Sequence, residues 1–171
     1  SAYLNLLTVY PDQPYDQPEI IHPISGCTIV KPEDMADFQT VLPKEEKVLE
    51  LVRQKTANGE RVLIYTSWTR TDSQQKLLKL LQENGYRTEI LAPQIATEKR
   101  EEWVDKRVKN GLQVLITNPR CVETGLDLNA FTTIIFYSMG YNLFTLRQAS
   151  RRSWRINQTE PKVCLLYTSD A

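Results

Sequence analysis

Four arginines lie within nine residues toward the end of this chain: Arg147, Arg151, Arg152 and Arg155. If the segment is helical, Gln148, Arg152 and Arg155 follow an i, i+4, i+7 spacing and share one face. No Asp or Glu occurs between Leu143 and Thr159, so no acid nearby in the sequence neutralises these guanidinium groups. Arginine presents its donors in a rigid fork that fits phosphate oxygens and can stabilise charge on a phosphoryl group during transfer. The spacing therefore indicates a site for a phosphate-bearing ligand, and a solvated basic face is the alternative.

The elements that must position these arginines begin at residue 44, where the hydrophobic pattern starts to alternate between helices and strands. Amphipathic stretches predict helices, with Thr71 and Thr97 as N-caps and Asn-Gly pairs at 58–59 and 84–85 as ends. Short continuous apolar runs predict strands buried on both faces. The predicted helices are 44–60, 71–86, 98–111 and 143–154, and the predicted strands are 61–66, 87–91, 112–117, 132–138 and 162–168.

This alternation predicts the fold class, an open parallel α/β sheet covered by helices on both faces. In such sheets, ligands gather beyond the carboxyl ends of the strands. The loops after Thr66, Thr117 and Ser138 are therefore expected to matter most for function.

The first 43 residues have a different composition. Six of the nine prolines fall at or before Pro43. Because proline fixes φ and removes a donor, we expect extended segments and turns, with short strands at 4–10 and 27–30 and no long helix. The predicted organisation is an irregular extension or inter-lobe segment over 1–43, followed by one domain over 44–171. The abrupt start in such a segment suggests a piece of a larger protein.

Composition excludes several classes of function. The chain has 21 basic and 21 acidic residues, so its overall charge does not attract nucleic acid or an anionic membrane. Any polyanion that it binds must therefore be bound at a local basic patch. Three cysteines without a CxxC pair and the single His22 argue against a disulfide scaffold and a structural metal, and we assign them structural roles. No apolar run reaches the roughly 20 residues that cross a bilayer, and we expect an intracellular, cytoplasmic protein without membrane contact. Neither GxxxxGK[ST] nor GxGxxG occurs, so the usual glycine-rich nucleotide loops are absent from the sequence.

Several segments resemble one family. "QASRRSWRINQ" resembles QxxDRxxRIGQ, motif VI of superfamily 2 helicases of the Swi/Snf-like group of DNA translocases. "VLITNPRCVETGLDL" is similar to motif V, and "RVLIYTSWTRTDSQQKLL" is similar to motif IV. "YNLFTLRQA" resembles the group's WNP segment, with Asn142 in the place of its asparagine. The resemblance runs in order from Lys44 to Thr168. Asp127 departs from the group's asparagine and is closer to the DEAD-box RNA helicases, and Asn157 replaces the glycine of RIGQ.

The resemblance implies a RecA-like second helicase lobe, P-loop NTPase-like in fold, which clamps ATP against a first lobe that carries the phosphate loop and binds Mg²⁺. By this resemblance Arg152 and Arg155 would reach the γ-phosphate and Gln148 would hold their geometry. Gly125 and Asp127 would approach the ribose side, although Asp127 could instead cap a turn. Nucleic acid would contact the strand ends through Thr66, Ser67, Trp68, Thr117, Asn118 and Arg120.

The expected function is thus the C-terminal motor lobe of an ATP-dependent Swi/Snf-like DNA helicase or translocase, inactive without the N-terminal RecA-like lobe of the same parent chain. Its expected cofactor is ATP with Mg²⁺, and its expected track is DNA, duplex rather than RNA. Two alternatives remain open: the second lobe of an RNA helicase, and a non-catalytic binding module with the same fold. Trp68 could stack on a base or simply pack, and packing is the favoured expectation for a lone tryptophan after a strand. Trp103, on an amphipathic helix, is expected in the core or at a contact with a partner.

Overall fold

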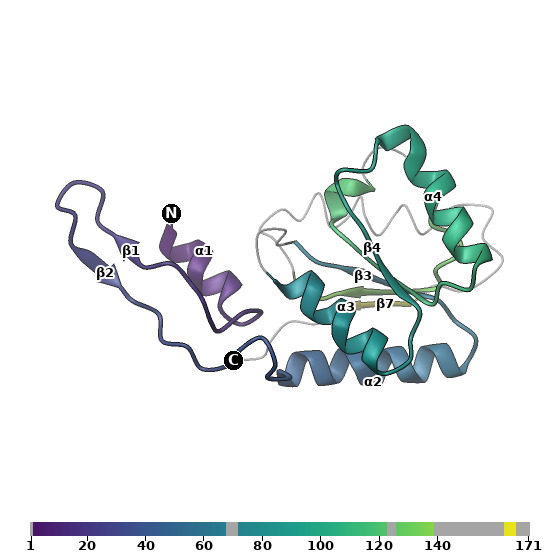
Figure 1. The fold of residues 1–171 in the computed structure, drawn as a ribbon, viewed down its shortest axis with the longest axis horizontal. Coiled ribbons are helices and arrows are strands. Elements are labelled where there is room, and N and C mark those ends of the chain that lie inside the picture. The colour runs from purple at the N-terminus through teal and green to yellow at the C-terminus, as the bar shows by residue number, and fades with distance from the viewer. Residues whose placement is uncertain (1, 68–71, 123–125, 139–162, 167–171) are drawn as a thin grey trace.

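The computed structural model describes residues 2–67, 72–122 and 126–138, and the strand at 163–166 (Figure 1). The predicted helix at 143–154 lies outside these residues. Among the described helices, none combines the length with the hydrophobicity that a membrane span requires.

A five-stranded sheet forms the centre of the molecule, with all neighbouring strands parallel and the order β4-β5-β3-β6-β7. The register is flush, since Val62 pairs with both Val114 and Thr133. All five predicted strands are confirmed, each within one or two residues of its expected bounds. They are β3 (Val62–Tyr65), β4 (Thr88–Leu91), β5 (Val114–Thr117), β6 (Thr133–Phe136) and β7 (Val163–Leu166).

Helices cover both faces of this sheet, as predicted. α2 (Pro43–Ala57) and α3 (Ser73–Glu83) pack on one face. α4 (Thr97–Lys109) packs on the other, together with a short 3-10 helix, η1 (Pro119–Cys121).

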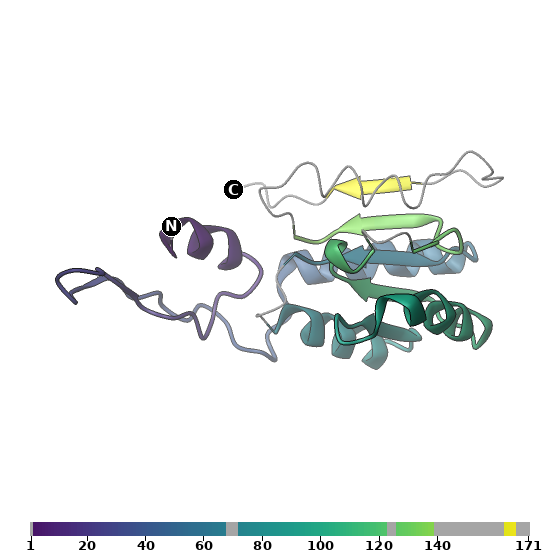
Figure 2. The same cartoon turned by 90° about the horizontal axis from the view of Figure 1, so that it is seen from above.

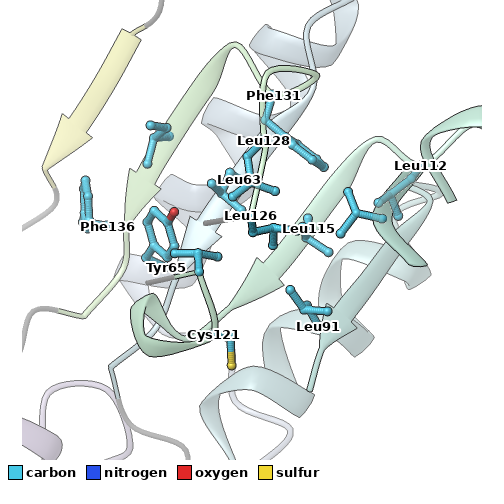
Figure 3. Close-up of a cluster of buried hydrophobic side chains, with 13 residues drawn as sticks. Leu63, Tyr65, Leu91, Leu112, Leu115, Cys121, Leu126, Leu128, Phe131 and Phe136 are labelled. Atoms are coloured by element: carbon cyan, nitrogen blue, oxygen red, sulfur yellow. The ribbon is translucent and has the colours of Figure 1, made fainter. Parts of the chain in front are cut away.

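The strand side chains alternate between two hydrophobic clusters, one on each face. Leu63 and Tyr65 join the cluster under α4, whereas Val62 and Ile64 join the cluster under α2 and α3. Figure 3 shows the first cluster, in which the Tyr65 and Phe136 rings stack with centroids 5.2 Å apart. Because both faces are buried, every residue of β3, β5 and β6 is apolar or fully enclosed. This is why these strands read as continuous apolar runs.

Each of the three central helices ends at an Asn-Gly pair. Gly59, Gly85 and Gly111 have positive φ, and the next residue donates its N–H five positions back, as in a Schellman motif. The two predicted ends at 58–59 and 84–85 are therefore confirmed. The two N-caps were predicted wrongly, each by one residue: Asp72 rather than Thr71 is the N-cap of α3, and Ala96 rather than Thr97 is the N-cap of α4.

Gly111→Ala is expected to lower the free energy of unfolding more than Gly85→Ala does. A Cβ on Gly111 would lie 2.5 Å from Nη1 of Arg87, whereas a Cβ on Gly85 meets nothing within 4 Å. Both variants force alanine into a left-handed backbone, which costs about 1 kcal/mol. Gly111→Ala also displaces the flexible, exposed guanidinium that donates to the Asn110 carbonyl at 2.9 Å, which adds about 0.5 kcal/mol. Urea denaturation of both variants checks this difference, and equal losses would contradict it.

The residues before α2 lie beyond one end of the sheet and have little regular structure. Ile20–Ile21 (β1) and Thr28–Val30 (β2) make a small antiparallel sheet, which confirms the strand predicted at 27–30. The strand predicted at 4–10 was wrong, because α1 (Ala2–Val9) is helical. That run precedes the first proline, Pro11, and its leucines are good helix formers, so nothing in it breaks a helix.

Candidate functional site

The carboxyl ends of three strands meet at one edge of the sheet, as expected from the sequence. β3 lies between β5 and β6, so the residues that follow these strands are neighbours. Ser67 joins two of the ends: its N–H donates to Oγ of Ser138 at 2.7 Å, and its hydroxyl donates to the Ser138 carbonyl at 2.8 Å. These two bonds, both donated by Ser67, fix the spacing between the ends of β3 and β6.

Asn118 joins the third end to the other two. Its Nδ2 donates to the carbonyls of Thr66 and Ser67 at 3.2 and 3.0 Å. Its Oδ1 accepts the N–H of Arg120 at 2.9 Å and so starts η1. The side chain of Arg120 is exposed at this edge, which leaves its guanidinium open to a ligand from solvent.

Three of the residues expected to contact nucleic acid lie inside the protein, and one of them is Asn118, which is 7% exposed and whose amide makes the internal bonds given above. Thr66 and Thr117 are both fully buried. Nε2 of Gln74 donates to the Thr66 hydroxyl at 2.6 Å, and the Thr117 hydroxyl donates to the Leu91 carbonyl at 3.2 Å. In this structure both hydroxyls bind protein atoms and support the edge from below.

Of the residues expected to contact ATP, only Asp127 is described. It is half-buried, and its Oδ1 accepts the Asn129 N–H at 3.1 Å, the turn-capping contact that the sequence left open as an alternative. Its approach to a ribose stays a prediction. The other expected residues lie outside the described part of the chain: Arg152, Arg155, Gln148 and Gly125 at the ATP site, and Trp68 at the nucleic-acid edge.

Sequence reasoning missed Arg100, which supports η1 from α4. Its guanidinium donates to the carbonyls of Ile95, Cys121 and Pro93 at 2.9, 2.9 and 3.1 Å. Three carbonyls from two loops are thereby held together, and one of those loops carries Arg120. In the sequence, Arg100 is one of many charged residues on a polar helix and has no distinguishing signal.

A buried group of four charges was also missed. The Asp12 carboxylate pairs with Lys44, and Oε2 of Glu45 lies 3.0 Å from Nζ of Lys76. The side chains of these four residues are 12% exposed or less. Lys76 could have been suspected, because it falls on the apolar stripe of its helix beside Leu77. Burying Asp12 depends on folding of the first segment onto α2, which no local pattern reveals.

Burial dominates the electrostatics of this group. It raises the pKa of the Asp12 carboxyl, against the opposing pull of Lys44. It raises the pKa of Tyr15 to about 12 and that of Tyr137 well above its usual value, with the nearby carboxylates adding to both effects. Both hydroxyls are therefore protonated at neutral pH. Among the described residues, the Tyr137 hydroxyl and Oε1 of Glu45 have no hydrogen-bond partner.

The histidine, two of the cysteines and Trp103 lie in turns, in the core or on the surface. Nδ1 of His22 accepts the Ser25 N–H at 3.1 Å within a turn, and Cys121 is buried in the first hydrophobic cluster. Trp103 packs against the same cluster, with the Arg107 guanidinium 3.6 Å from its ring centroid. Cys27 is exposed and forms no disulfide with Cys121, the other cysteine whose side chain the structure describes.

The fold and the strand-end edge agree with one family. Residues 43–157 match the helicase conserved C-terminal domain, and the chain belongs to this family. Similar proteins include the chromatin-remodeling ATPase INO80 of Emericella nidulans, 30% identical over 155 residues, and the helicase SWR1 of Cryptococcus neoformans, 32% identical over 123 residues. The chain is the C-terminal RecA-like lobe of a Swi/Snf-like superfamily 2 helicase.

Solved structures agree with this fold. The C-terminal part of the Fun30 ATPase domain aligns with a TM-score of 0.68 and 21% identity, over 83% of this chain and 45% of that one. The helicase domain of Pyrococcus furiosus Hef aligns with a TM-score of 0.54 and 18% identity, over 73% of this chain and 25% of that one.

The relatives are much longer than the region they share with this chain. The matches cover 85% of this chain but 9% of the Emericella protein, and 68% of this chain but 9% of the Cryptococcus protein. The chain thus spans about a tenth of the length of these relatives.

Proposed function

We propose that this chain supplies the second half of a composite ATP site in a DNA translocase or helicase. Arg152 and Arg155 reach the γ-phosphate, Gln148 holds their geometry, and Gly125 and Asp127 approach the ribose. The first lobe, an N-terminal RecA-like domain of the same parent chain, binds most of the ATP and its Mg²⁺. ATP supplies the phosphoryl group whose transfer releases energy for movement, and the arginines stabilise the charge that develops on it.

The residues present fit only part of an ATP site. The chain has no glycine-rich phosphate loop, so it lacks the backbone N–H groups that usually cradle the β- and γ-phosphates. Its Asp127 can add a polar contact, and its arginines can add positive charge. We therefore expect the isolated chain to bind ATP weakly and to hydrolyse essentially none.

Nucleic acid is proposed to bind at the shared edge of β3, β5 and β6. The observation that carries this proposal is the convergence of Ser67, Asn118 and Arg120, three residues from two separate motifs, at one edge with an exposed guanidinium. Thr66, Thr117 and the buried side chain of Asn118 support this edge, and Arg120 is the exposed side chain that reaches the ligand. Contacts of this kind bind phosphates without reading the base sequence.

DNA is the proposed track, because the named relatives include chromatin-remodeling ATPases. RNA is the second candidate, since "TGLDL" places Asp127 where RNA helicases of the DEAD-box group have an aspartate. The ATPase rate of the protein with both lobes, measured with duplex DNA and with RNA, separates the two. Stronger stimulation by RNA would overturn the DNA assignment. An intracellular location belongs to the same proposal.

Arg120→Gln is expected to weaken binding of all DNA sequences to a similar extent. One fewer phosphate contact should reduce the slope of log K against log salt concentration by about 1. The exposed Arg53 on α2 offers a matched control, because Arg53→Gln removes the same charge away from the strand-end edge. Fluorescence anisotropy across a salt series measures both slopes. Equal slopes for the two variants would remove Arg120 from the proposed interface.

A further inference from the structure

Residues 10–42, called the N-terminal segment below, pack beside the edge at which nucleic acid is proposed to bind. In Figure 2 the part of the chain before α2 lies beyond the end of the sheet toward which the arrow of β7 points. The segment is exposed along much of its length, but Asp12, Gln13 and Tyr15 are 2%, 6% and 3% exposed. These three residues therefore anchor it to the lobe.

Asp12 connects the segment to the end of β6. Its carboxylate binds Nζ of Lys44, and that ammonium lies 4.5 Å from the centroid of the Tyr137 ring. Tyr137 directly precedes Ser138, whose hydroxyl and carbonyl hold Ser67. A buried ammonium over an aromatic face keeps its position only while its carboxylate partner stays in place.

Gln13 connects the segment to the end of β3 by another path. Its Oε1 accepts the Asp72 N–H at 2.9 Å, at the start of α3. Two residues further on, within the first turn of that helix, Gln74 donates to the Thr66 hydroxyl at 2.6 Å. Thr66 directly precedes Ser67, so the two connections converge on the same strand-end residue.

We propose that Asp12 and Gln13 are positioning residues for nucleic-acid binding. By fixing Tyr137 and the start of α3, they hold Ser67 and Ser138 in the arrangement that keeps Asn118 and Arg120 at the binding edge. The N-terminal segment is thus part of the motor lobe, and this assignment rests on the proposed nucleic-acid function.

The test uses the protein with both lobes and measures its ATPase rate over a series of duplex DNA concentrations. Asp12→Asn and Gln13→Ala are each expected to raise the DNA concentration for half-maximal stimulation about tenfold, the equivalent of one or two lost hydrogen bonds. The KM for ATP and the rate without DNA are expected to stay unchanged. Gln13→Met keeps the length and packing of the side chain but removes the acceptor of the Asp72 N–H, so it is expected to weaken the DNA response as much as Gln13→Ala does.

Asp37→Asn is the matched control within the same segment. Asp37 is exposed and its carboxylate accepts only from Gln39 and Thr40 in the contacts described, so its loss should leave the DNA response unchanged. Unchanged DNA concentrations in Gln13→Ala, alongside a lower unfolding temperature, would overturn the inference and leave a purely structural role. The two Gln13 variants test the inference even if Asp12→Asn fails to fold. A wild-type ATPase that ignores DNA would instead overturn the proposed function, and this inference with it.

Discussion

Arg152→Ala and Arg155→Ala are each expected to lower kcat by at least about a hundredfold in the protein with both lobes. The proposed reason is electrostatic. Each guanidinium would stabilise negative charge that grows on the γ-phosphoryl oxygens in the transition state, so its loss falls on the chemical step. DNA binding should stay nearly intact, because the proposed nucleic-acid contacts come from the residues that follow β3 and β5.

Arg147→Ala is the control for this prediction. Arg147 belongs to the same basic cluster but does not match the helicase motif, so its loss should leave kcat close to the wild-type value. Steady-state ATPase kinetics with saturating DNA give kcat and KM, and anisotropy gives DNA affinity for the same proteins. Near-normal turnover in both Arg152→Ala and Arg155→Ala would remove their proposed roles. An equal loss in Arg147→Ala would indicate a general effect of charge.

Lys76→Met is expected to lower the free energy of unfolding of this chain by about 3–5 kcal/mol. Nζ of Lys76 lies 3.0 Å from Oε2 of Glu45 and donates to the Thr40 carbonyl at 2.6 Å. Methionine keeps the apolar stem but leaves a carboxylate buried without its cation. Glu45 already has one oxygen without a hydrogen-bond partner among the described residues, so it has no ready substitute. The midpoint of thermal unfolding should fall by roughly 10 °C.

A second substitution separates loss of the charge pair from loss of packing. Adding Glu45→Gln to Lys76→Met removes the stranded charge while keeping an oxygen for the Leu42 N–H, which donates to Oε2 of Glu45 at 2.7 Å. The double variant should recover more than half of the lost stability. Lys79→Met, one turn along α3, should change stability by less than 1 kcal/mol, because its pair with Glu83 is 3.9 Å long and exposed. Similar losses in Lys76→Met and Lys79→Met would contradict the role assigned to burial.

The strands and helix ends were predictable because each depends on residues close together in the chain. A strand such as 62–65 is apolar throughout since both of its faces are covered, and Asn-Gly at 84–85 ends a helix since glycine accepts a positive φ. The error at 4–10 has the same local origin. That short run of apolar residues fits either a strand or a helix, because its hydrophobic periodicity does not distinguish the two.

The side-chain roles at the binding edge were less predictable. The sequence placed Thr66, Ser67, Thr117 and Asn118 in one group of ligand contacts. In the fold, the two threonine hydroxyls bond inward and the serine and asparagine join neighbouring strands. Which way a strand-end side chain turns depends on partners that are 8 to 71 residues away in the chain.

By itself, the sequence determined the class of fold, the order of its elements and the family to which the lobe belongs. These properties follow from hydrophobic periodicity, from turn residues and from motifs that are continuous in the chain. Only the tertiary structure decided that residues 10–42 join the lobe through Asp12 and Gln13, and that two lysines and two carboxylates balance one another in its interior. Pairing of this kind is settled by burial: a charge removed from water must find its partner wherever folding brings one, however distant that partner is in the chain.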